Sequence, residues 1–272
     1  MPGWNKPCEV EDFADPAMAD AIRRIFPDDC DYGAYRKHWE IAMAVRAAAT
    51  LLPAARRKVA VGVGAGKEAS SFYLTHLFDE VIATDLYRTP AWPLDSPPDM
   101  LHHPERYAGG TPFVPGRLRV QHMDGRALEF ADAAADFLYS SGSIEHFGTF
   151  DDIRRAASEM GRVLRPGGII AISTELCVRG QAGYLQPDTL LLSMDMLQDL
   201  IVRPSGCLPV DELRSTLSAA TLAHPVAFAF AARDRVRMHQ SGSRRWSQYP
   251  HIVIEDGDRA WTSYHLTLRK PQ

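Results

Sequence analysis

The stretch VAVGVGAGKE, residues 59–68, begins with alternating valines and ends in closely spaced glycines. Valine favours a buried strand, and glycine permits the tight turn that follows it. A glycine-rich turn between a strand and a helix commonly binds a nucleotide, because its backbone N–H groups remain available to the ligand. The stretch therefore predicts a nucleotide site, which leaves open whether that nucleotide carries phosphates.

The turn departs from both common phosphate-binding patterns. A P-loop needs a glycine five residues before Gly66 and a Ser or Thr after Lys67, but Val61 and Glu68 stand there. The dinucleotide pattern G-x-G-x-x-G has a different spacing from the G-x-G-x-G found here. The chain also has no tyrosine followed by lysine four residues on, a pair that a short-chain dehydrogenase needs. These departures exclude a P-loop and weaken an NAD site.

Composition and charge narrow the class of protein. A length of 272 residues suits one large α/β domain, and the net charge of −4 gives no electrostatic reason to expect nucleic acid or a membrane surface as partner. No stretch of about 18 apolar residues occurs, and the first residues have no apolar core of a signal peptide. The four cysteines show no C-x-x-C pair, which suits a reducing compartment. We therefore expect a cytoplasmic protein that does not span a membrane.

Predicted strands and helices alternate along the chain. Helices are expected at residues 35–52, 67–78 and 151–164, and strands at 58–63, 80–85, 117–124, 134–141 and 167–176. This alternation indicates a parallel sheet with helices on both faces. Between the strands, residues 89–116 hold seven of the nineteen prolines, which predicts an irregular lid insertion.

The C-terminal third has a different pattern. Residues 190–201 and 211–222 have helical spacing, and HPVAFAFAA at 224–232 predicts a strand. Asp256-Gly257 separates two runs rich in Val, Ile, Thr and Tyr, which is typical of a β-hairpin. We therefore expect an antiparallel pair at the end of the sheet.

Five stretches occur in an order that resembles the class I S-adenosylmethionine-dependent methyltransferases, and in particular their type 11-like branch, which acts on small molecules and glycans. They are VAVGVGAGKE, VIATDLY, HMDGRALEF, ADFLYSSGSIEHFG and GRVLRPGGIIAISTE. The resemblance covers about residues 58–175, and the RPGG turn in the last stretch has no counterpart in dehydrogenases. It implies a Rossmann-like, doubly wound α/β fold with a seven-stranded sheet, mostly parallel with an antiparallel C-terminal hairpin, and helices on both faces. Residues 1–57 would form an N-terminal helical cap and 58–272 the methyltransferase domain.

The same resemblance implies S-adenosylmethionine as cofactor and S-adenosylhomocysteine as product. Gly62, Gly64 and Gly66 would let the backbone approach the methionine portion of the cofactor. Asp85, at the end of the second strand, would accept hydrogen bonds from both ribose hydroxyls, and Leu86 would contact the cofactor beside it. Alternatively, the glycines form only a tight turn and Asp85 is a turn or N-cap residue.

Two further groups of residues complete the implied cofactor site. Met123, Asp124 and Gly125 follow the third strand and would meet the adenine, with Asp124 accepting from its amino group. Ser140 and Ser141 end the fourth strand and would pass close to the methionine portion. Asp124 could instead cap a turn, and Met123 could instead belong to the core.

One position departs from the family. Its members commonly carry an acidic residue two positions before the first glycine of the turn, and Ala60 stands there in this chain. That acid engages the amino end of the cofactor, so Glu68 or a backbone carbonyl near Tyr139 would have to replace it. The departure keeps open a protein of the same fold that binds the cofactor but catalyses a non-methylating step.

His146, just after the fourth strand, is the candidate catalytic base for a hydroxyl or amine acceptor. The alternative is that it anchors the helix that follows. Glu145, His146 and Glu175 have side chains that suit a metal ion, but their spacing does not support a site, so no metal is predicted.

The acceptor is expected to be a small molecule or sugar-like compound methylated at oxygen or nitrogen. Trp39, Trp92 and Tyr184 are candidates to stack on it, although aromatic residues more often belong to a core. SGSRRWSQY at 241–249 interleaves basic and aromatic residues, which keeps RNA as a less favoured substrate. The sequence leaves open whether the chain forms a homodimer through its antiparallel sheet edge.

Overall fold

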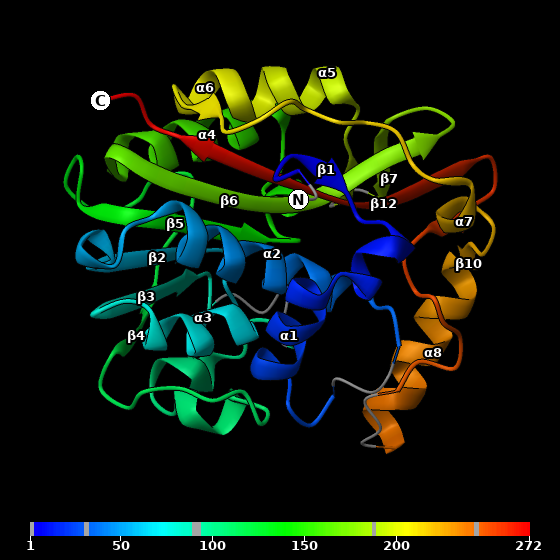
Figure 1. The fold of residues 1–272 in the computed structure, drawn as a ribbon, viewed down its shortest axis with the longest axis horizontal. Helices are drawn as coiled ribbons and strands as arrows, with labels where there is room; N and C mark the ends of the chain where they lie inside the picture. Colours follow the sequence, from blue (N-terminus) through cyan, green and yellow to red (C-terminus); the bar gives the residue numbers. More distant parts are fainter. Residues whose placement is uncertain (1–2, 30–32, 89–93, 187–188, 242–244) are drawn as a thin grey trace.

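The computed structural model describes residues 3–29, 33–88, 94–186, 189–241 and 245–272. Its centre is a ten-stranded sheet with the order β10-β11-β12-β6-β5-β2-β3-β4, and β1 and β9 pair with β12 (Figure 1). The strands of this sheet are β1 Lys6–Pro7, β2 Val59–Val63, β3 Glu80–Asp85, β4 Leu118–His122, β5 Ala135–Ser141, β6 Leu164–Arg179, β9 Leu208–Pro209, β10 Val226–Ala227, β11 Ile254–Asp256 and β12 Arg259–Arg269. A separate pair is formed by β7 Gly183–Gln186 and β8 Thr189–Leu191.

The expected sheet is confirmed, with additions. Strands β4, β3, β2, β5 and β6 are parallel, whereas β12 runs antiparallel to β6 and β11 antiparallel to β12. These seven strands form the predicted mostly parallel sheet with its C-terminal hairpin. Two strands of two residues each, β1 and β9, were not predicted, whereas β10 is a two-residue remnant of the strand predicted at 224–232. Because β1, β9 and β11 each pair with part of the outer edge of β12, little of that edge is left open.

The helices cover both faces of the sheet, as the alternating sequence pattern predicts. They are α1 Pro16–Ile25, α2 Arg36–Leu51, α3 Ala69–Tyr73, α4 Phe150–Val163, α5 Met194–Leu197, α6 Arg203–Ser205, α7 Ala219–Leu222 and α8 Phe228–Ser241. Short 3-10 turns lie at η1 Val10–Ala14, η2 Ala54–Arg56, η3 Leu74–His76, η4 Pro98–Leu101, η5 Pro104–Tyr107 and η6 Ile144–His146, and a π-turn at η7 Gln198–Val202.

Successive residues of the central strands pack into opposite layers, as the pleat of a strand requires. Phe137 and Tyr139 of β5 point into the cluster formed with α1 and α2, while Leu138 between them points into the cluster with α4. The same alternation separates Ala60 from Val61 in β2. The side chains on both faces of the sheet are apolar and buried against helices. This packing fixes the strands, so the carboxyl ends of the parallel strands lie in fixed positions along one edge of the sheet.

The helix ends show why the main helices begin and end where they do. Thr149 caps α4, and Asp152 returns the contact to form a capping box. Asp15 accepts hydrogen bonds at the start of α1, where Pro16 is the first helical residue. The predicted helix at 35–52 corresponds to α2, which ends just before Pro53.

The C-terminal third contains the predictions that were wrong. Residues 190–201 begin in β8 and continue in α5 and η7 rather than in one helix. Residues 224–232 form only the two-residue strand β10 before α8 begins, because the alternating phenylalanines lie between alanines that favour a helix.

Residues 211–222 are helical only in α7 because the preceding part pairs with the N-terminal segment. The Asp211 carboxylate accepts from the backbone N–H of Trp4, and Arg214 N–H donates to the Asn5 carbonyl. These long-range contacts override the helical spacing of the sequence.

The described part of the Pro-rich insertion, residues 94–116, consists of η4, η5 and turns. Met100 packs against Phe72 and Tyr87, which attaches the insertion to α3 and to the loop after β3. The Asp95 carbonyl accepts from Lys67 N–H at 3.0 Å, so this segment lies directly on the glycine turn.

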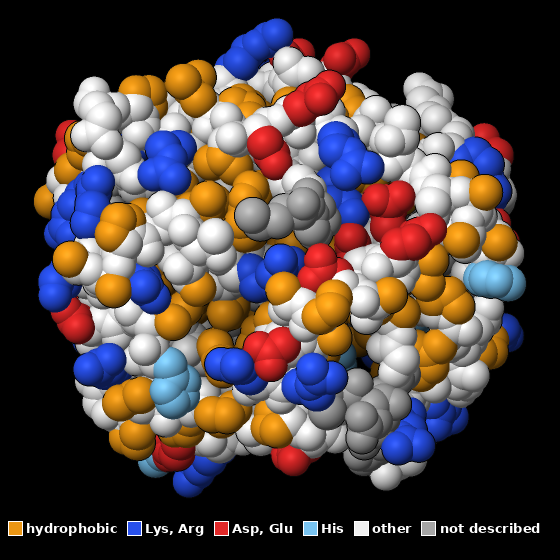
Figure 2. All heavy atoms as spheres, viewed as in Figure 1, with side chains coloured by type: hydrophobic (Ala, Val, Ile, Leu, Met, Phe, Trp, Pro, Cys, Tyr) orange, Lys and Arg blue, Asp and Glu red, His pale blue; other side chains and the backbone are white. Residues whose placement is uncertain are grey.

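Among the described residues, no helix is long and apolar enough to cross a membrane. Figure 2 shows Lys and Arg side chains interspersed with Asp and Glu side chains on the face it presents. On that face, apart from the residues drawn in grey, the charges form no basic stripe of the kind that tracks a nucleic-acid backbone, in keeping with the small net negative charge.

Candidate functional site

The glycine turn lies at the carboxyl end of β2, where ligands bind in open α/β sheets. Gly64 and Gly66 have positive φ angles of 65° and 47°, which glycine adopts without strain. A Cβ atom at Gly62 would lie 2.5 Å from Cζ of the Tyr139 ring, so this position has no room for a side chain. The close packing explains why the turn needs three glycines.

Asp85 lies beside the turn, as the sequence predicts. Its Oδ2 accepts from Gly66 N–H at 2.8 Å and its Oδ1 from Leu86 N–H at 2.6 Å. Burial raises the pKa of Asp85, and the two N–H groups oppose that shift. Each carboxylate oxygen can accept a second hydrogen bond, so the group still fits two ribose hydroxyls. Leu86 is 37% exposed beside it, where a ligand can reach its side chain.

The residues after β4 adopt three different environments. Met123 is buried, and Asp124 is paired with Arg126 through hydrogen bonds of 2.7 to 3.1 Å. These hydrogen bonds lower the pKa of Asp124 and keep it ionised. A Cβ atom at Gly125 would lie 2.8 Å from the Phe147 ring.

Phe147 connects the predicted cofactor groups but was not singled out in the sequence. Its ring also lies 3.0 Å from the position of a Cβ atom at Gly64, so it touches both the glycine turn and the residues after β4. The signal that could have found it is its place in the EHF stretch, one residue after His146.

Polar atoms without partners collect where β5 ends. The hydroxyls of Ser140 and Ser141 and Oε1 of Glu145 are buried, and none has a hydrogen-bond partner within the described residues. Ser140 and Ser141 are consecutive in β5 and point to opposite faces of the sheet, so the Ser141 hydroxyl, on the α2 side, and Glu145 Oε1 are the pair that one polar ligand can complete. The residues present therefore fit a cofactor with a polar amino-acid portion.

Next to these atoms lies a charged network that joins α2 to β6 and β12. Arg36 Nη1 contacts both carboxylate oxygens of Glu175 at 2.6 Å and donates to the Ser263 hydroxyl at 2.8 Å. The Ser263 hydroxyl donates in turn to Glu40. Lys37 Nζ lies 3.0 Å from Glu40 and 3.3 Å from Glu175. The sequence predicted neither Glu40 nor Ser263 here, because only the fold brings α2 against β12.

The pKa values of Glu175 and of the neighbouring Glu145 are shifted in opposite directions. Burial alone would raise the pKa of Glu175, but the Arg36 and Lys37 cations outweigh burial and lower that pKa to about 2. Burial raises the pKa of Glu145, which has no ion-pair partner among the described residues and receives only the Thr174 hydroxyl at 3.0 Å. Glu175 is therefore held as a carboxylate, whereas burial disfavours the charged form of Glu145.

His146 ends the short turn η6 and is half-buried. Its backbone N–H donates to the Ser143 carbonyl at 2.9 Å, within the turn. That contact uses the backbone only, so it leaves the role of the imidazole as a prediction.

The three aromatic residues expected to stack on the acceptor differ in their exposure to solvent. Trp39 is fully buried in the core, where its indole packs edge-on against His265, so the expectation that it contacts an acceptor is wrong. Trp92 lies outside the described residues. Tyr184 is 40% exposed and lines an open pocket.

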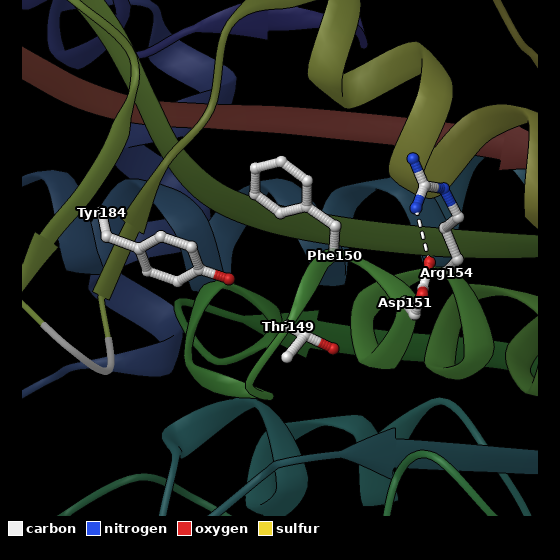
Figure 3. Close-up of a pocket in the computed structure, with 5 residues that line it drawn as sticks. All are labelled: Thr149, Phe150, Asp151, Arg154 and Tyr184. Atoms are coloured by element: carbon white, nitrogen blue, oxygen red, sulfur yellow. Dashed lines mark hydrogen bonds and ion pairs between the residues drawn. The ribbon is translucent and has the colours of Figure 1, made fainter.

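That pocket has a volume of about 430 Å³ and is formed by the start of α4 together with β7. Figure 3 shows the rings of Phe150 and Tyr184 together with the ion pair of Asp151 and Arg154. The ring centroids are 5.9 Å apart at an interplanar angle of 13°, and the Tyr184 hydroxyl donates to the Gly148 carbonyl at 2.7 Å. The pocket thus adjoins the turn that carries His146.

No group of three or more His, Cys, Asp or Glu side chains in the described part of the chain has the arrangement of a metal site. Glu145 and Glu175, considered above as metal ligands, are instead a hydrogen-bonded acid and an ion-paired one.

Comparison with known proteins places this geometry in a family. Residues 59–172 match the family model of a type 11 methyltransferase domain. An uncharacterized methyltransferase of Mycobacterium sp. (strain JLS) is 26% identical over 208 residues, which are 76% of this chain and 74% of that protein.

Two solved structures share the fold at low sequence identity. Phosphoethanolamine N-methyltransferase 2 of Haemonchus contortus, in complex with S-adenosyl-L-methionine, has a TM-score of 0.55 and 15% identity, covering 97% of this chain and 60% of that chain. A protein from Galdieria sulphuraria assigned as a sarcosine dimethylglycine methyltransferase has a TM-score of 0.54 and 12% identity, covering 86% and 85% of the two chains. With the sheet order, the glycine turn and the domain match in agreement, residues 59–172 form a methyltransferase domain of the class I S-adenosylmethionine-dependent type.

Proposed function

We propose that this methyltransferase acts on an oxygen or nitrogen atom of a small-molecule or sugar-like acceptor. The observation that carries the proposal is the open pocket beside η6, whose volume of about 430 Å³ suits a small molecule. The names of the two structural neighbours describe small amines as acceptors, which supports a small acceptor here.

The lining of the pocket supports a ligand with both flat apolar faces and hydroxyl or amino groups. The partly exposed rings of Phe150 and Tyr184 offer apolar surface, and Asp151 and Arg154 offer an acceptor and donors at its rim. A sugar ring has this combination of C–H faces and hydroxyls. Removal of the Tyr184 ring is therefore expected to weaken acceptor binding more than cofactor binding.

The cofactor, when bound, supplies a methyl group on a positively charged sulfur. We assign its ribose to Asp85 and its adenine to the space beside Leu86, Met123, Asp124 and Gly125. Its methionine portion is assigned to the glycine turn together with Ser140 and Ser141, whose hydroxyls have no hydrogen-bond partner among the residues that the structure describes. The protein contributes chiefly alignment and exclusion of water.

The transfer needs a group that takes a proton from the acceptor. The bound cofactor would supply its methyl group to a lone pair of the acceptor, with the electrons of the broken sulfur–carbon bond staying on sulfur in the product S-adenosylhomocysteine. The proton of the hydroxyl or amine must then leave, and His146, on the turn beside the pocket, is the proposed base.

The test is formation of S-adenosylhomocysteine from S-adenosylmethionine with panels of sugars, hydroxylated aromatics and small amines. With an acceptor in hand, His146→Gln is expected to lower kcat by roughly 10²- to 10⁴-fold, because the base is lost. Binding of S-adenosylhomocysteine should stay unchanged, which a titration of the same variant checks. A His146→Gln enzyme with normal kcat would show that the residue only anchors its turn.

Ala60 favours one second candidate, a protein that binds the cofactor without transferring its methyl group. Its side chain is fully buried, so no acid stands at the position where the family commonly has one. The two candidates differ in product: conversion of an acceptor without any S-adenosylhomocysteine would support the second.

A further inference from the structure

Position 60 cannot serve a ligand in this chain. Ala60 is fully buried in β2, paired with Val81 on one side and Phe137 on the other, and belongs to the apolar cluster under α2. A carboxylate at that depth would lose its hydration without gaining a partner from these neighbours. The positive groups of the cofactor therefore need a carboxylate from another element.

Glu68 carries a carboxylate directly after the glycine turn, and this carboxylate has not yet been assigned a partner. It follows the glycine turn as the N-cap residue of α3, but its side chain makes no capping hydrogen bond. Its Oε2 accepts only from the Ser70 hydroxyl at 3.1 Å, and no cation lies within ion-pair distance of it in the described residues. A partly buried acid without a cation is costly, which indicates a missing positive partner.

The groups that face Glu68 come from three elements. Glu68 interacts electrostatically with Glu40 and Lys37 of α2 and with Asp85 at the end of β3. Its charge also raises the pKa of the Tyr87 and Tyr139 phenols. Burial and the carboxylates of Glu40 and Asp85 raise the pKa of Glu68, and Lys37 only partly opposes them. Glu68 is thus within electrostatic range of both the proposed ribose acceptor and the charged network, in surroundings with a surplus of acids.

A second observation points to a ligand at the end of β5, which Lys37 connects with the surroundings of Glu68. The hydroxyls of Ser140 and Ser141 and Oε1 of Glu145 are more than nine-tenths buried and have no partner within the described chain. Lys37 Nζ lies 2.4 Å from where a Cβ atom of Gly142 would be, so the network that faces Glu68 also reaches this strand end.

We propose that Glu68 binds the α-ammonium group of the S-adenosylmethionine cofactor, in place of the acid that position 60 lacks. The assignment rests on the cofactor site proposed above. Because the ammonium favours the ionised carboxylate, binding releases a proton whenever Glu68 is protonated beforehand. Affinity for the cofactor should therefore fall as pH is lowered through the raised pKa of Glu68.

The experiment compares two ligands by calorimetric titration of the full chain. S-adenosylhomocysteine carries the α-ammonium group, whereas 5′-methylthioadenosine has the same adenosine and thioether without the amino acid portion. Glu68→Gln, which keeps the shape of the side chain, is expected to weaken S-adenosylhomocysteine at least about tenfold at neutral pH. It should leave 5′-methylthioadenosine unchanged. Asp85→Asn, which acts on the ribose, should weaken both ligands.

Each outcome decides between explanations. Equal loss of both ligands in Glu68→Gln would mean that Glu68 only supports the turn, and no loss of either would remove it from the site; both results overturn the proposal. If the unmodified protein binds neither ligand, the cofactor site itself is wrong and the proposal falls with it. A pH dependence of S-adenosylhomocysteine affinity that persists in Glu68→Gln would also contradict the assignment.

Discussion

Replacement of Asp85 by asparagine is expected to weaken binding of S-adenosylhomocysteine by about 100-fold. The carboxylate has free capacity for two ribose hydroxyls, and hydrogen bonds to a charged group contribute about 1.5–3 kcal/mol each. Asparagine keeps one carbonyl oxygen but replaces the other acceptor with an amide donor, which also faces Gly66 or Leu86 N–H unfavourably. Calorimetric titration gives the affinity, and urea unfolding shows whether the fold is retained.

The matched control is Asp79→Asn, one residue before the same strand. Asp79 is 59% exposed and pairs only with Lys58, so this variant should bind S-adenosylhomocysteine as the unmodified chain does. Equal affinity in Asp85→Asn and Asp79→Asn would contradict the ribose assignment.

Arg36→Met is expected to reduce the free energy of unfolding by about 3–5 kcal/mol. Removal of one partner from a buried ion pair leaves the other charge without compensation, and Glu175 is only 7% exposed. Lys37 remains near Glu175, but at 3.3 Å and with a side chain that is one-third exposed, so it compensates only in part. Urea unfolding at neutral pH measures the difference.

The control for this variant is Arg24→Met on α1. Arg24 pairs with Asp20 in an i,i+4 contact, and both side chains are about half or more exposed, so the loss should stay below about 1 kcal/mol. Losses of equal size at the two arginines would show that the network does not stabilise the fold.

The pH dependence of Arg36→Met has a definite sign. The folded protein lowers the pKa of Glu175 from 4.5 to about 2, so the stabilisation is complete above pH 4.5 and is lost as pH falls toward 2. The difference in stability between the unmodified chain and Arg36→Met should therefore narrow across that window. A constant difference from pH 7 to pH 3 would mean that the charge of Glu175 is not the cause.

The sequence predicts the parts of this fold whose signals are local. The glycine spacing at residues 62–66 and the strand ending in Asp85 each lie within a few residues, and the sheet order follows from the succession of the strands. The Asp256-Gly257 hairpin is confirmed for the same reason: Asp256 pairs with Arg259 across a two-residue turn. The turn expected at residues 165–168 is wrong, because β6 already begins at Leu164 and includes them.

Features that depend on distant pairing could not be predicted. Ser263 meets Glu40 across 223 positions of the chain, and the irregular course of residues 211–218 depends on the N-terminal segment. The periodic spacing of apolar residues in the sequence gives no information about such long-range contacts. The prediction for Trp39 was wrong for a different reason. Its position near the start of α2 suggested a contact with a ligand, but the helix directs that side chain into the core.

The most direct test of the account is a calorimetric titration of the unmodified protein with S-adenosylhomocysteine, beside the same titration with NAD. We expect saturable binding of S-adenosylhomocysteine at one site per chain and no saturable binding of NAD, because the glycine spacing and the acids around Asp85 suit an adenosine without phosphates. Saturable binding of NAD with none of S-adenosylhomocysteine would contradict the account.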